Sequence, residues 1–189
     1  MSAPGSSSCG LWHDEGVNSS LAGKLLVASP HLIDPNFYRT VVLLLLHDNE
    51  DGALGLVINR ETSEPAIDYL PEWIDHIVPP GLVHYGGPVE PDVAIGLGHG
   101  QGRGTPGVSM VDLSEPPNPE SPKVRVFSGY AGWSPGQLEE ELTTGSWFVV
   151  DGAPDDPFAY PTTLWQQVLR RQEGLLALWS TFPDDPELN

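Results

Sequence analysis

The sequence predicts an α+β fold in which many short strands and a few short helices form one domain. The chain holds 21 Gly and 20 Pro residues among 189, which favours turns and short elements over long helices. Strand-like patterns recur: 123–127 alternates polar and apolar residues, and Val41–Leu46 is a continuous apolar run. Apolar residues at helical spacing are clearest in two segments, 134–142 and 162–172.

The strongest strand signal is 38–46, because its apolar run indicates burial on both faces of a sheet. Turn-forming residues follow at 47–52, and 54–59 returns as a strand, so the two strands are expected to pair as a hairpin. The other predicted strands are 24–29, 82–85, 93–97, 108–113, 123–127 and 146–150.

The clearest helix start is SPGQ at 134–137, which matches a capping box. Ser134 is the expected cap, Pro135 takes the first helical position, and Gln137 stands three residues after the cap. Gly145 is placed to end this helix. The other predicted helical segments are 62–78 as one or two short helices, 162–172 capped by Thr162 or Thr163, and 175–182.

Residues 1–20 are rich in Ser and Gly and are expected to form a disordered tail, and 21–189 is expected to fold as a single domain. No run of 18 apolar residues predicts a membrane span. The N-terminus lacks the basic and apolar regions of a signal peptide. Together with the single cysteine, Cys9, these features favour a cytoplasmic protein.

The charge is strongly unbalanced, with 26 acidic residues against 8 Lys and Arg and a net charge of −18. Such a surface repels phosphate backbones and anionic lipids and favours basic partners, although the acidity can also serve solubility alone. The basic residues are scattered, and only Arg170 and Arg171 are adjacent. We therefore expect no direct binding to nucleic acid and no binding to membranes.

The segment GWSPG at 132–136 matches the G-x-S-x-G motif of serine hydrolases. Two facts oppose a nucleophilic Ser134. The oxyanion hole uses the backbone N–H of the next residue, and Pro135 has none. No histidine follows Ser134 in the chain, as the usual order of such hydrolases requires. The helix cap is the preferred interpretation of Ser134.

Other groups of residues carry weaker signals for metal or phosphate sites. They are Cys9 with His13, His76 with His84, and the carboxylates at 48, 50 and 51. Two ligands are too few for zinc, and the acidic turn lacks the distant bidentate Glu of a calcium loop. The glycine-rich segment 96–107 lacks the Lys-Ser/Thr of a phosphate loop and is expected to be a surface loop. No catalytic residue, metal or cofactor is predicted.

Four stretches resemble the YqgE/AlgH family of bacterial proteins. They are LLVASPHLIDPNFYRTVVLLLLH (25–47), GALGLVINR (52–60), YGGPVEPD (85–92) and GYAGWSPGQLEEEL (129–142), and they occur in the family's order. The resemblance implies a compact α+β domain whose mixed sheet curls into a barrel-like arrangement with peripheral helices. It implies no chemistry, since the family has no established activity. The family's name reflects a suggested link to alginate regulation, which we do not carry over to this chain.

A polar and aromatic cluster is predicted where strands give way to turns, and such turns can line a pocket. Arg60 is one of few cations and can hold an anionic group through a bidentate contact. The alternative is that Arg60 pairs with one of the many carboxylates and that the glycines serve tight packing. The candidate ligand-binding or partner-binding residues are Asn59, Arg60, Gly86, Gly87, Gly129, Tyr130 and Trp133.

The first functional hypothesis is a non-catalytic cytoplasmic protein that binds an unknown protein or small molecule, so that any regulatory role is indirect. The alternative is an enzyme whose pocket is lined by the glycine and aromatic turns.

Overall fold

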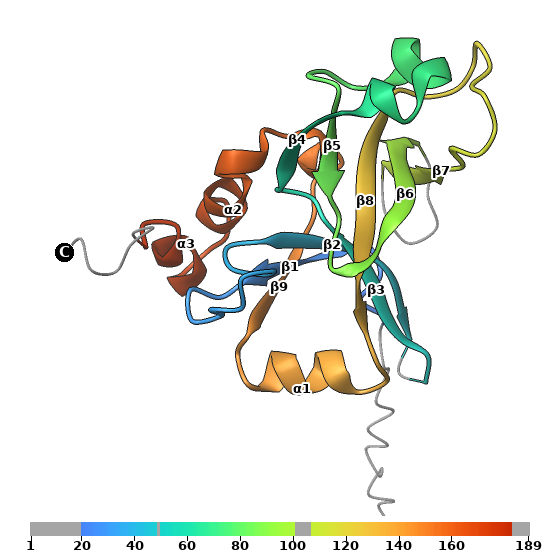
Figure 1. Cartoon of the computed structure of the whole chain (residues 1–189). Coiled ribbons are helices and arrows are strands. Elements are labelled where there is room, and N and C mark those ends of the chain that lie inside the picture. Colours follow the sequence, from blue (N-terminus) through green and yellow to red (C-terminus); the bar gives the residue numbers. More distant parts are fainter. Residues whose placement is uncertain (1–19, 49, 101–106, 183–189) are drawn as a thin grey trace, which may run out of the picture.

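The computed structural model describes residues 20–182 except 49 and 101–106. The predicted tail up to residue 19, with Cys9 and His13, lies outside the described residues, and so does most of the glycine-rich loop. Within them, nine strands and six short helices form one α+β domain (Figure 1). The strands are β1 (Lys24–Ala28), β2 (Val41–Asp48), β3 (Gly52–Val57), β4 (Glu61–Pro65), β5 (Leu82–Tyr85), β6 (Val89–His99), β7 (Val108–Val111), β8 (Val124–Trp133) and β9 (Trp147–Asp151). The α-helices are α1 (Gln137–Thr143), α2 (Pro161–Arg170) and α3 (Leu175–Trp179), and the 3₁₀ helices are η1 (Ala66–Asp68), η2 (Pro71–His76) and η3 (Asp156–Phe158).

The strands form one mixed sheet in the order β4-β5-β8-β3-β2-β1-β9, with β6 paired to β8 and β7 paired to β6. The β5–β8 pair is parallel, and the other pairs are antiparallel. The strand β8 divides the sheet into two arms, because its first half pairs with β5 and β6 and its second half pairs with β3. We call β4, β5, β6 and β7 the first arm, and β3, β2, β1 and β9 the second arm.

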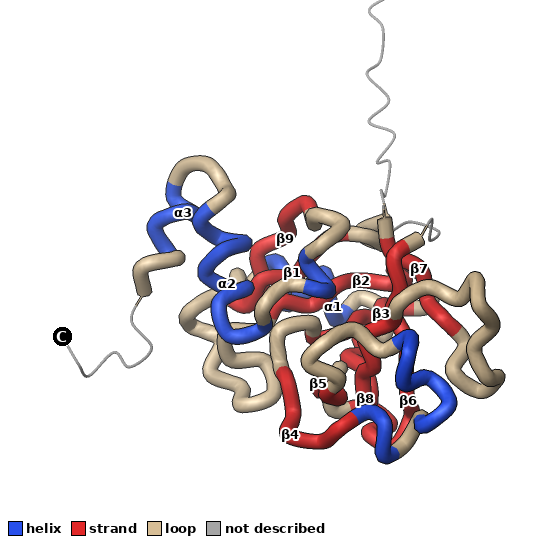
Figure 2. The backbone as a smooth tube through the Cα atoms, turned by 90° about the horizontal axis from the view of Figure 1, so that it is seen from above, coloured by secondary structure: helices blue, strands red, loops and turns tan. Residues whose placement is uncertain are grey.

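The sheet is open, so the barrel-like arrangement implied by the resemblance is wrong. Within the described chain β4 and β9 end the strand order and do not pair with each other. The composition of β4 suits an edge, because it is short, almost fully exposed, and ends at Pro65, which has no backbone N–H to donate. Figures 1 and 2 place α2 and α3 on one side of the molecule and β6 and β7 on the other.

Both faces of β2 are buried from Val41 to Leu45, as its apolar run predicted, whereas Leu46 is 63% exposed. Alternate residues Val41, Leu43 and Leu45 belong to the core that packs against α2, whereas Val42 and Leu44 belong to the core on the α1 side. A third, smaller core lies under η2 and joins Trp73 with the first arm. Helix α2 buries the predicted apolar face, which consists of Leu164, Trp165, Val168 and Leu169.

Three elements differ from the sequence prediction. Residues 96–99, expected to belong to a glycine-rich surface loop, are the end of β6 and pair with β7. Residues 61–65 form the strand β4, and only 66–76 is helical, as two 3₁₀ turns rather than α-helix. Residues 129–133, expected as a turn, are the second half of β8. The glycines there suggested a turn, but Ala131 and Gly132 pair with β3, a partner about 75 residues earlier in the chain. Long-range pairing overrode the local signal.

The predicted helix caps are wrong, although the predicted end of α1 is confirmed. Helix α1 is preceded by Gly136 in the left-handed conformation, and no side chain caps it. Gln137 makes half of the expected box, since its Oε1 accepts a hydrogen bond from the Ser134 N–H at 3.1 Å. Helix α2 begins at Pro161 and likewise has no side-chain cap. Gly145 ends α1 with a φ of 76° and donates to the Leu142 carbonyl.

None of the described helices is long and apolar enough to cross a membrane.

Candidate functional site

The three glycines among the candidate residues serve a close backbone crossing. A Cβ on Gly86 would overlap the carbonyl oxygen of Gly129, and a Cβ on Gly87 would overlap the backbone of Tyr130. Gly86 donates to the Ser128 carbonyl and accepts from the Val57 N–H, both at 2.8 Å. These residues therefore join the end of β5 to β8 and β3. Tight packing, the alternative given in the sequence analysis, therefore explains the three glycines.

Trp133 is a core residue on the α1 side of the sheet, 6% exposed. Its ring stacks on Phe37 at 6.2 Å and meets Trp147 edge-on at 6.0 Å. Glu141 of α1 holds both indoles, because its Oε2 accepts from Nε1 of Trp133 at 2.9 Å and from Nε1 of Trp147 at 2.7 Å. The sequence analysis missed Glu141, whose only sequence signal is its position eight residues after Trp133.

Asn59 is occupied by backbone hydrogen bonds. Its Oδ1 accepts from the Val41 N–H at 2.8 Å, and its Nδ2 donates to the Arg39 carbonyl at 2.9 Å. Arg39 has a φ of 54°, an uncommon conformation for a residue with a side chain. Asn59 thus fixes the turn that leads into β2 and has a structural function.

Arg60 lines an open cleft of about 610 Å³ together with Asn36, Tyr85 and Thr162. The guanidinium is half-buried and donates from Nη2 to the Tyr38 carbonyl at 3.1 Å. It makes no ion pair with a carboxylate in the described part of the chain. The alternative from the sequence, a surface pair with one of the many acids, is therefore not what the described residues show.

Two nearby groups influence the charge of Arg60. Burial lowers the pKa of its guanidinium, while Tyr85 and Asp34 raise it. Asp34 is itself engaged, because its Oδ1 accepts from the Asn36 N–H at 2.7 Å. Burial also raises the pKa of Tyr85. At neutral pH the cleft therefore presents a cation beside a neutral phenol.

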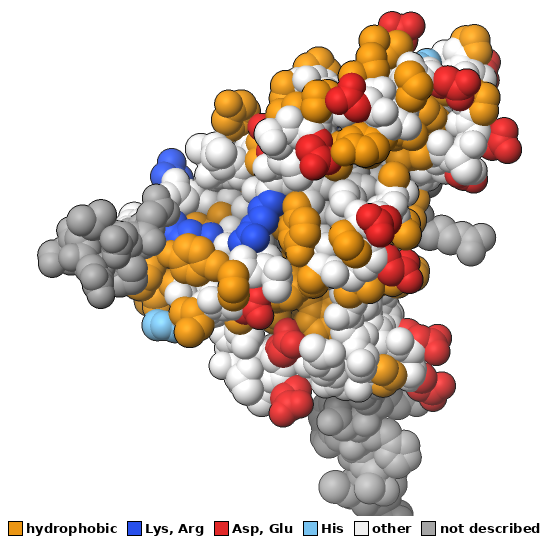
Figure 3. All heavy atoms as spheres, viewed as in Figure 1, with side chains coloured by type: hydrophobic (Ala, Val, Ile, Leu, Met, Phe, Trp, Pro, Cys, Tyr) orange, Lys and Arg blue, Asp and Glu red, His pale blue; other side chains and the backbone are white. Residues whose placement is uncertain are grey.

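The amino end of α2 also faces this cleft, through Pro161 and Thr162. The first backbone N–H groups of a helix have no partner within it, and here no side chain of the described residues caps them. They carry the positive end of the helix dipole and favour an anion. On the face shown in Figure 3, Lys and Arg side chains lie in the middle and towards α2, whereas carboxylates surround the upper and lower edges.

The predicted residues do not form one cluster. Asn59 and Arg60 share the cleft, and Gly86, Gly87, Gly129 and Tyr130 form the backbone crossing. Trp133 is apart from Arg60, because it pairs with Ala53 at the start of β3, whereas Arg60 follows the end of that strand. At about 3.3 Å per residue, the strand alone separates them by more than about 10 Å.

The burial of two basic side chains near β5 was not predicted from the sequence. His84, considered there only as a weak metal candidate with His76, is 1% exposed; its Nε2 has no hydrogen-bond partner among the described residues, and Glu61 Oε2 lies 3.9 Å away. Arg125 is 4% exposed and donates to the carbonyls of Pro157, Phe158 and Ala159. It therefore fixes η3, the element that precedes α2 in the chain. Alternation within a strand gives no sign that a basic residue on the buried face will be satisfied by distant carbonyls.

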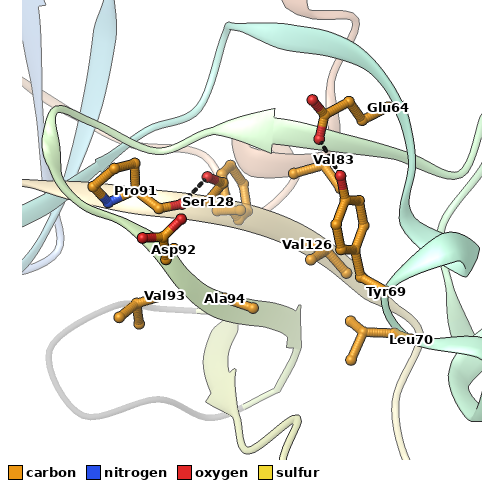
Figure 4. Close-up of a pocket in the computed structure, with 11 residues that line it drawn as sticks. Glu64, Tyr69, Leu70, Val83, Pro91, Asp92, Val93, Ala94, Val126 and Ser128 are labelled. Carbon is orange, nitrogen blue, oxygen red and sulfur yellow. Dashed lines mark hydrogen bonds between the residues drawn. The ribbon is translucent and has the colours of Figure 1, made fainter.

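A second pocket, of about 500 Å³, lies in the first arm and shares no lining residue with the Arg60 cleft (Figure 4). Its floor is formed by Val83 of β5 and Val126 of β8, with Leu70 after η1 and Ala94 of β6 beside them. The carboxylates of Glu64 and Asp92 stand on its two sides. The sequence analysis did not predict this pocket, because its walls come from four segments that are far apart in the chain.

Ser134 is exposed at the β8–α1 junction, and its hydroxyl makes no hydrogen bond within the described residues. Among those residues, no group of three or more His, Cys, Asp or Glu side chains is arranged to hold a metal ion.

Comparison with known proteins places the chain in a family. A family model described as AlgH-like matches residues 25–177. A UPF0301 protein of Streptomyces coelicolor is 50% identical over 187 residues, covering 90% of this chain and 96% of that protein. The crystal structure of a protein from Corynebacterium diphtheriae has a TM-score of 0.79 at 32% identity, covering 87% of this chain and 94% of that one. The solution structure of AlgH from Pseudomonas aeruginosa has a TM-score of 0.64 at 27% identity, covering 89% and 97%. The chain belongs to the AlgH-like family, as the four sequence stretches predicted.

Proposed function

We propose that this protein is a non-catalytic binding protein whose Arg60 cleft holds a carboxylate group of its ligand. The observation that carries the proposal is a half-buried arginine with no carboxylate partner among the described residues, in a chain of net charge −18. A buried cation is normally paired. An unpaired one at an open cleft is suited to an anion that arrives with the ligand.

A carboxylate fits this cleft better than a phosphate. The cleft has one cation, neutral polar groups on Asn36, Tyr85 and Thr162, and the positive end of the α2 dipole. Glu61 also lines it and repels every negative charge of a ligand, so a dianion is opposed more strongly than a monoanion. A carboxylate brings one negative charge to Arg60 and the α2 dipole, whereas a dianion would bring a second one into an acidic protein.

The proposal is tested with three probes on the full-length protein: N-acetyl-leucine, acetate and inorganic phosphate. We expect the two carboxylates to produce saturable NMR shifts at the Thr162 amide and the Arg60 side chain, and phosphate to produce weaker ones. Arg60→Gln abolishes these shifts, while Arg60→Lys retains part of them, because the charge stays but the bidentate geometry is lost. Arg170→Gln, which removes an exposed arginine at the other end of α2, is the matched control.

If no carboxylate shifts these signals, or if Arg60→Gln binds as well as the unmodified protein, the proposal is wrong. N-acetyl-leucinamide, which lacks the carboxylate, should give no shifts, and tighter binding of N-acetyl-leucine than of acetate would favour the C-terminus of a partner over a small free metabolite. We also propose a cytoplasmic location, which the low cysteine content supports.

A further inference from the structure

The pocket in Figure 4 is an apolar groove on a sheet face that its covering helices leave partly open. Val83 and Val126 are neighbours on this face and belong to the core under η2. The 3₁₀ helices η1 and η2 cover part of this face, and the covered part ends near Leu70. What remains uncovered is a groove of about 500 Å³ between η1 and β6, within the size range of ligand pockets.

An irregularity in β6 forms the second wall of the groove. The register with β8 jumps from Val89↔Tyr130 to Ala94↔Ser128, so the intervening residues of β6 bulge away from the sheet. The bulge exposes Val93 to 41%, and across the groove Tyr69 is 62% exposed. Large apolar side chains this exposed beside an apolar pocket mark an interaction surface.

The charge on this groove has one sign. Glu64 flanks it on the β4 side and Asp92 on the β6 side, and no Lys or Arg is among its lining residues. The Tyr69 hydroxyl donates to Glu64 Oε2 at 2.7 Å, which fixes that carboxylate at the rim. The carboxylate of Asp92 makes no hydrogen bond within the described residues. Two carboxylates at opposite sides of an apolar floor are complementary to a cationic and apolar partner.

We propose that this groove binds a short peptide segment of a partner protein in which an apolar side chain stands beside Lys or Arg. The apolar side chain contacts Val83 and Val126, and the flanking cations face Glu64 and Asp92. A peptide is favoured over a small amine because the carboxylates of Glu64 and Asp92 stand on opposite sides of the groove, so that one amine cannot face both. The overall charge of −18 steers basic segments towards the surface.

The site is separate from the proposed carboxylate site, since the two share no lining residue and have opposite charge preference. If the experiment refutes one proposal, the other proposal is therefore unaffected.

The test uses the full chain and four probes: the capped tetrapeptides Lys-Phe-Leu-Lys, Glu-Phe-Leu-Glu and Lys-Ser-Ser-Lys, and 4-phenylbutylamine. We expect Lys-Phe-Leu-Lys to give saturable NMR shifts at the amides of Val83, Val93 and Val126, and the two altered peptides to give none. The double variant Glu64→Gln, Asp92→Asn should weaken Lys-Phe-Leu-Lys about fivefold. The matched double variant Glu140→Gln, Asp155→Asn, which also loses two exposed carboxylates, should bind as before.

Equal binding of Glu-Phe-Leu-Glu, or shifts confined to other parts of the molecule, would refute the proposal. So would binding of 4-phenylbutylamine at these amides in the absence of tetrapeptide binding, because the groove would then be a small-molecule site. The melting temperatures of the two double variants are compared first. Equal values show that Glu64→Gln, Asp92→Asn is as well folded as the control, so that a loss of binding reports on the groove.

Discussion

At the scale of single residues, Glu141 illustrates how one carboxylate organises a buried aromatic cluster. It accepts hydrogen bonds from two indole N–H groups through the same oxygen, and its other oxygen accepts from Gln137 Nε2 at 2.9 Å. An indole N–H that is buried without a partner costs free energy, and two indoles depend on this side chain. The stretch 129–142, one of the four that resemble the family, therefore packs β8 against α1.

We predict that Glu141→Ala lowers the free energy of unfolding by about 2 kcal/mol, because it leaves the N–H groups of Trp133 and Trp147 without an acceptor. Glu140→Ala, at the exposed neighbouring position, should change it by less than about 0.5 kcal/mol. Chemical denaturation followed by tryptophan fluorescence measures both. Equal losses in the two variants would show that the indole hydrogen bonds contribute nothing.

Gly129 and Gly145 allow the free-energy cost of a left-handed backbone conformation to be measured apart from the cost of steric overlap. Their φ angles are 68° and 76°, but a Cβ on Gly129 would lie 2.6 Å from the Gly87 oxygen and 2.8 Å from the Val89 oxygen, whereas nothing lies within 4 Å at Gly145. Both Ala variants pay about 1 kcal/mol for the left-handed conformation. Gly129→Ala should lose a further 1–3 kcal/mol or so from overpacking.

Thermal and urea unfolding of the two variants measure the difference. Similar losses at both positions would mean that the backbone crossing at 86–87 and 129–130 can relax, and would leave those glycines available for another role.

At the scale of elements, the junction between β8 and α1 shows why a strong local pattern misled. The Ser-Pro-Gly-Gln pattern is a sound helix start, yet Gly136 takes the position before the helix and Ser134 stays outside it. The retained interaction runs from the Ser134 backbone to the Gln137 side chain. The capping signal located the helix correctly but assigned the wrong residue to the cap.

Ser134→Ala should therefore change stability by less than about 0.5 kcal/mol, not by the 1 kcal/mol or so of a lost cap. Gln137→Ala should cost more, because it removes the acceptor of the Ser134 N–H and a donor to Glu141. Denaturation of both variants in one buffer tests the ranking. A larger loss for Ser134→Ala would restore Ser134 as the cap.

The predictable part of the fold was local, and the rest depended on distant partners. The β2–β3 hairpin, β5 and α2 could be predicted because their apolar patterns match the burial that they meet. Residues 129–133 could not, because glycine signals a turn unless a distant strand pairs with it. Arg60 was identified because cations are rare in this chain, whereas the absence of an ion pair to it among the described residues is visible only in three dimensions.

At the scale of the whole molecule, pH should change stability through His84. Burial first, and then the charge of Arg125, lower its pKa from 6.5 to about 4, while a hydrogen bond with the Leu82 carbonyl opposes the shift. Below pH 6.5 the unfolded chain takes up a proton that the folded chain refuses, so stability is present above that pH and is lost as pH falls towards 4.

Between about pH 7.5 and 5, this group should cost about 2 kcal/mol of unfolding free energy. Urea unfolding at the two pH values measures the loss, and His84→Leu should show a smaller one, since the leucine does not titrate. The same pH dependence in both proteins would assign the effect to other groups.

The whole-molecule charge also predicts that the protein does not bind duplex DNA specifically. With a net charge of −18 and 8 scattered Lys and Arg residues, no continuous positive track is available to phosphates. A gel shift with competitor DNA at physiological salt should show no complex. A complex that survives these conditions would contradict the prediction and would favour direct regulation.

The position of β8 between the two arms has a consequence for synthesis on the ribosome. Strands β3, β5 and β6 all precede β8 in the chain and pair with it. Strand β1 pairs with β9, which is synthesised after β8. When residues up to 99 have been made, three strands still lack their central partner and present open edges. The nascent chain should therefore remain aggregation-prone, and a natural client of chaperones, until residue 133 has emerged.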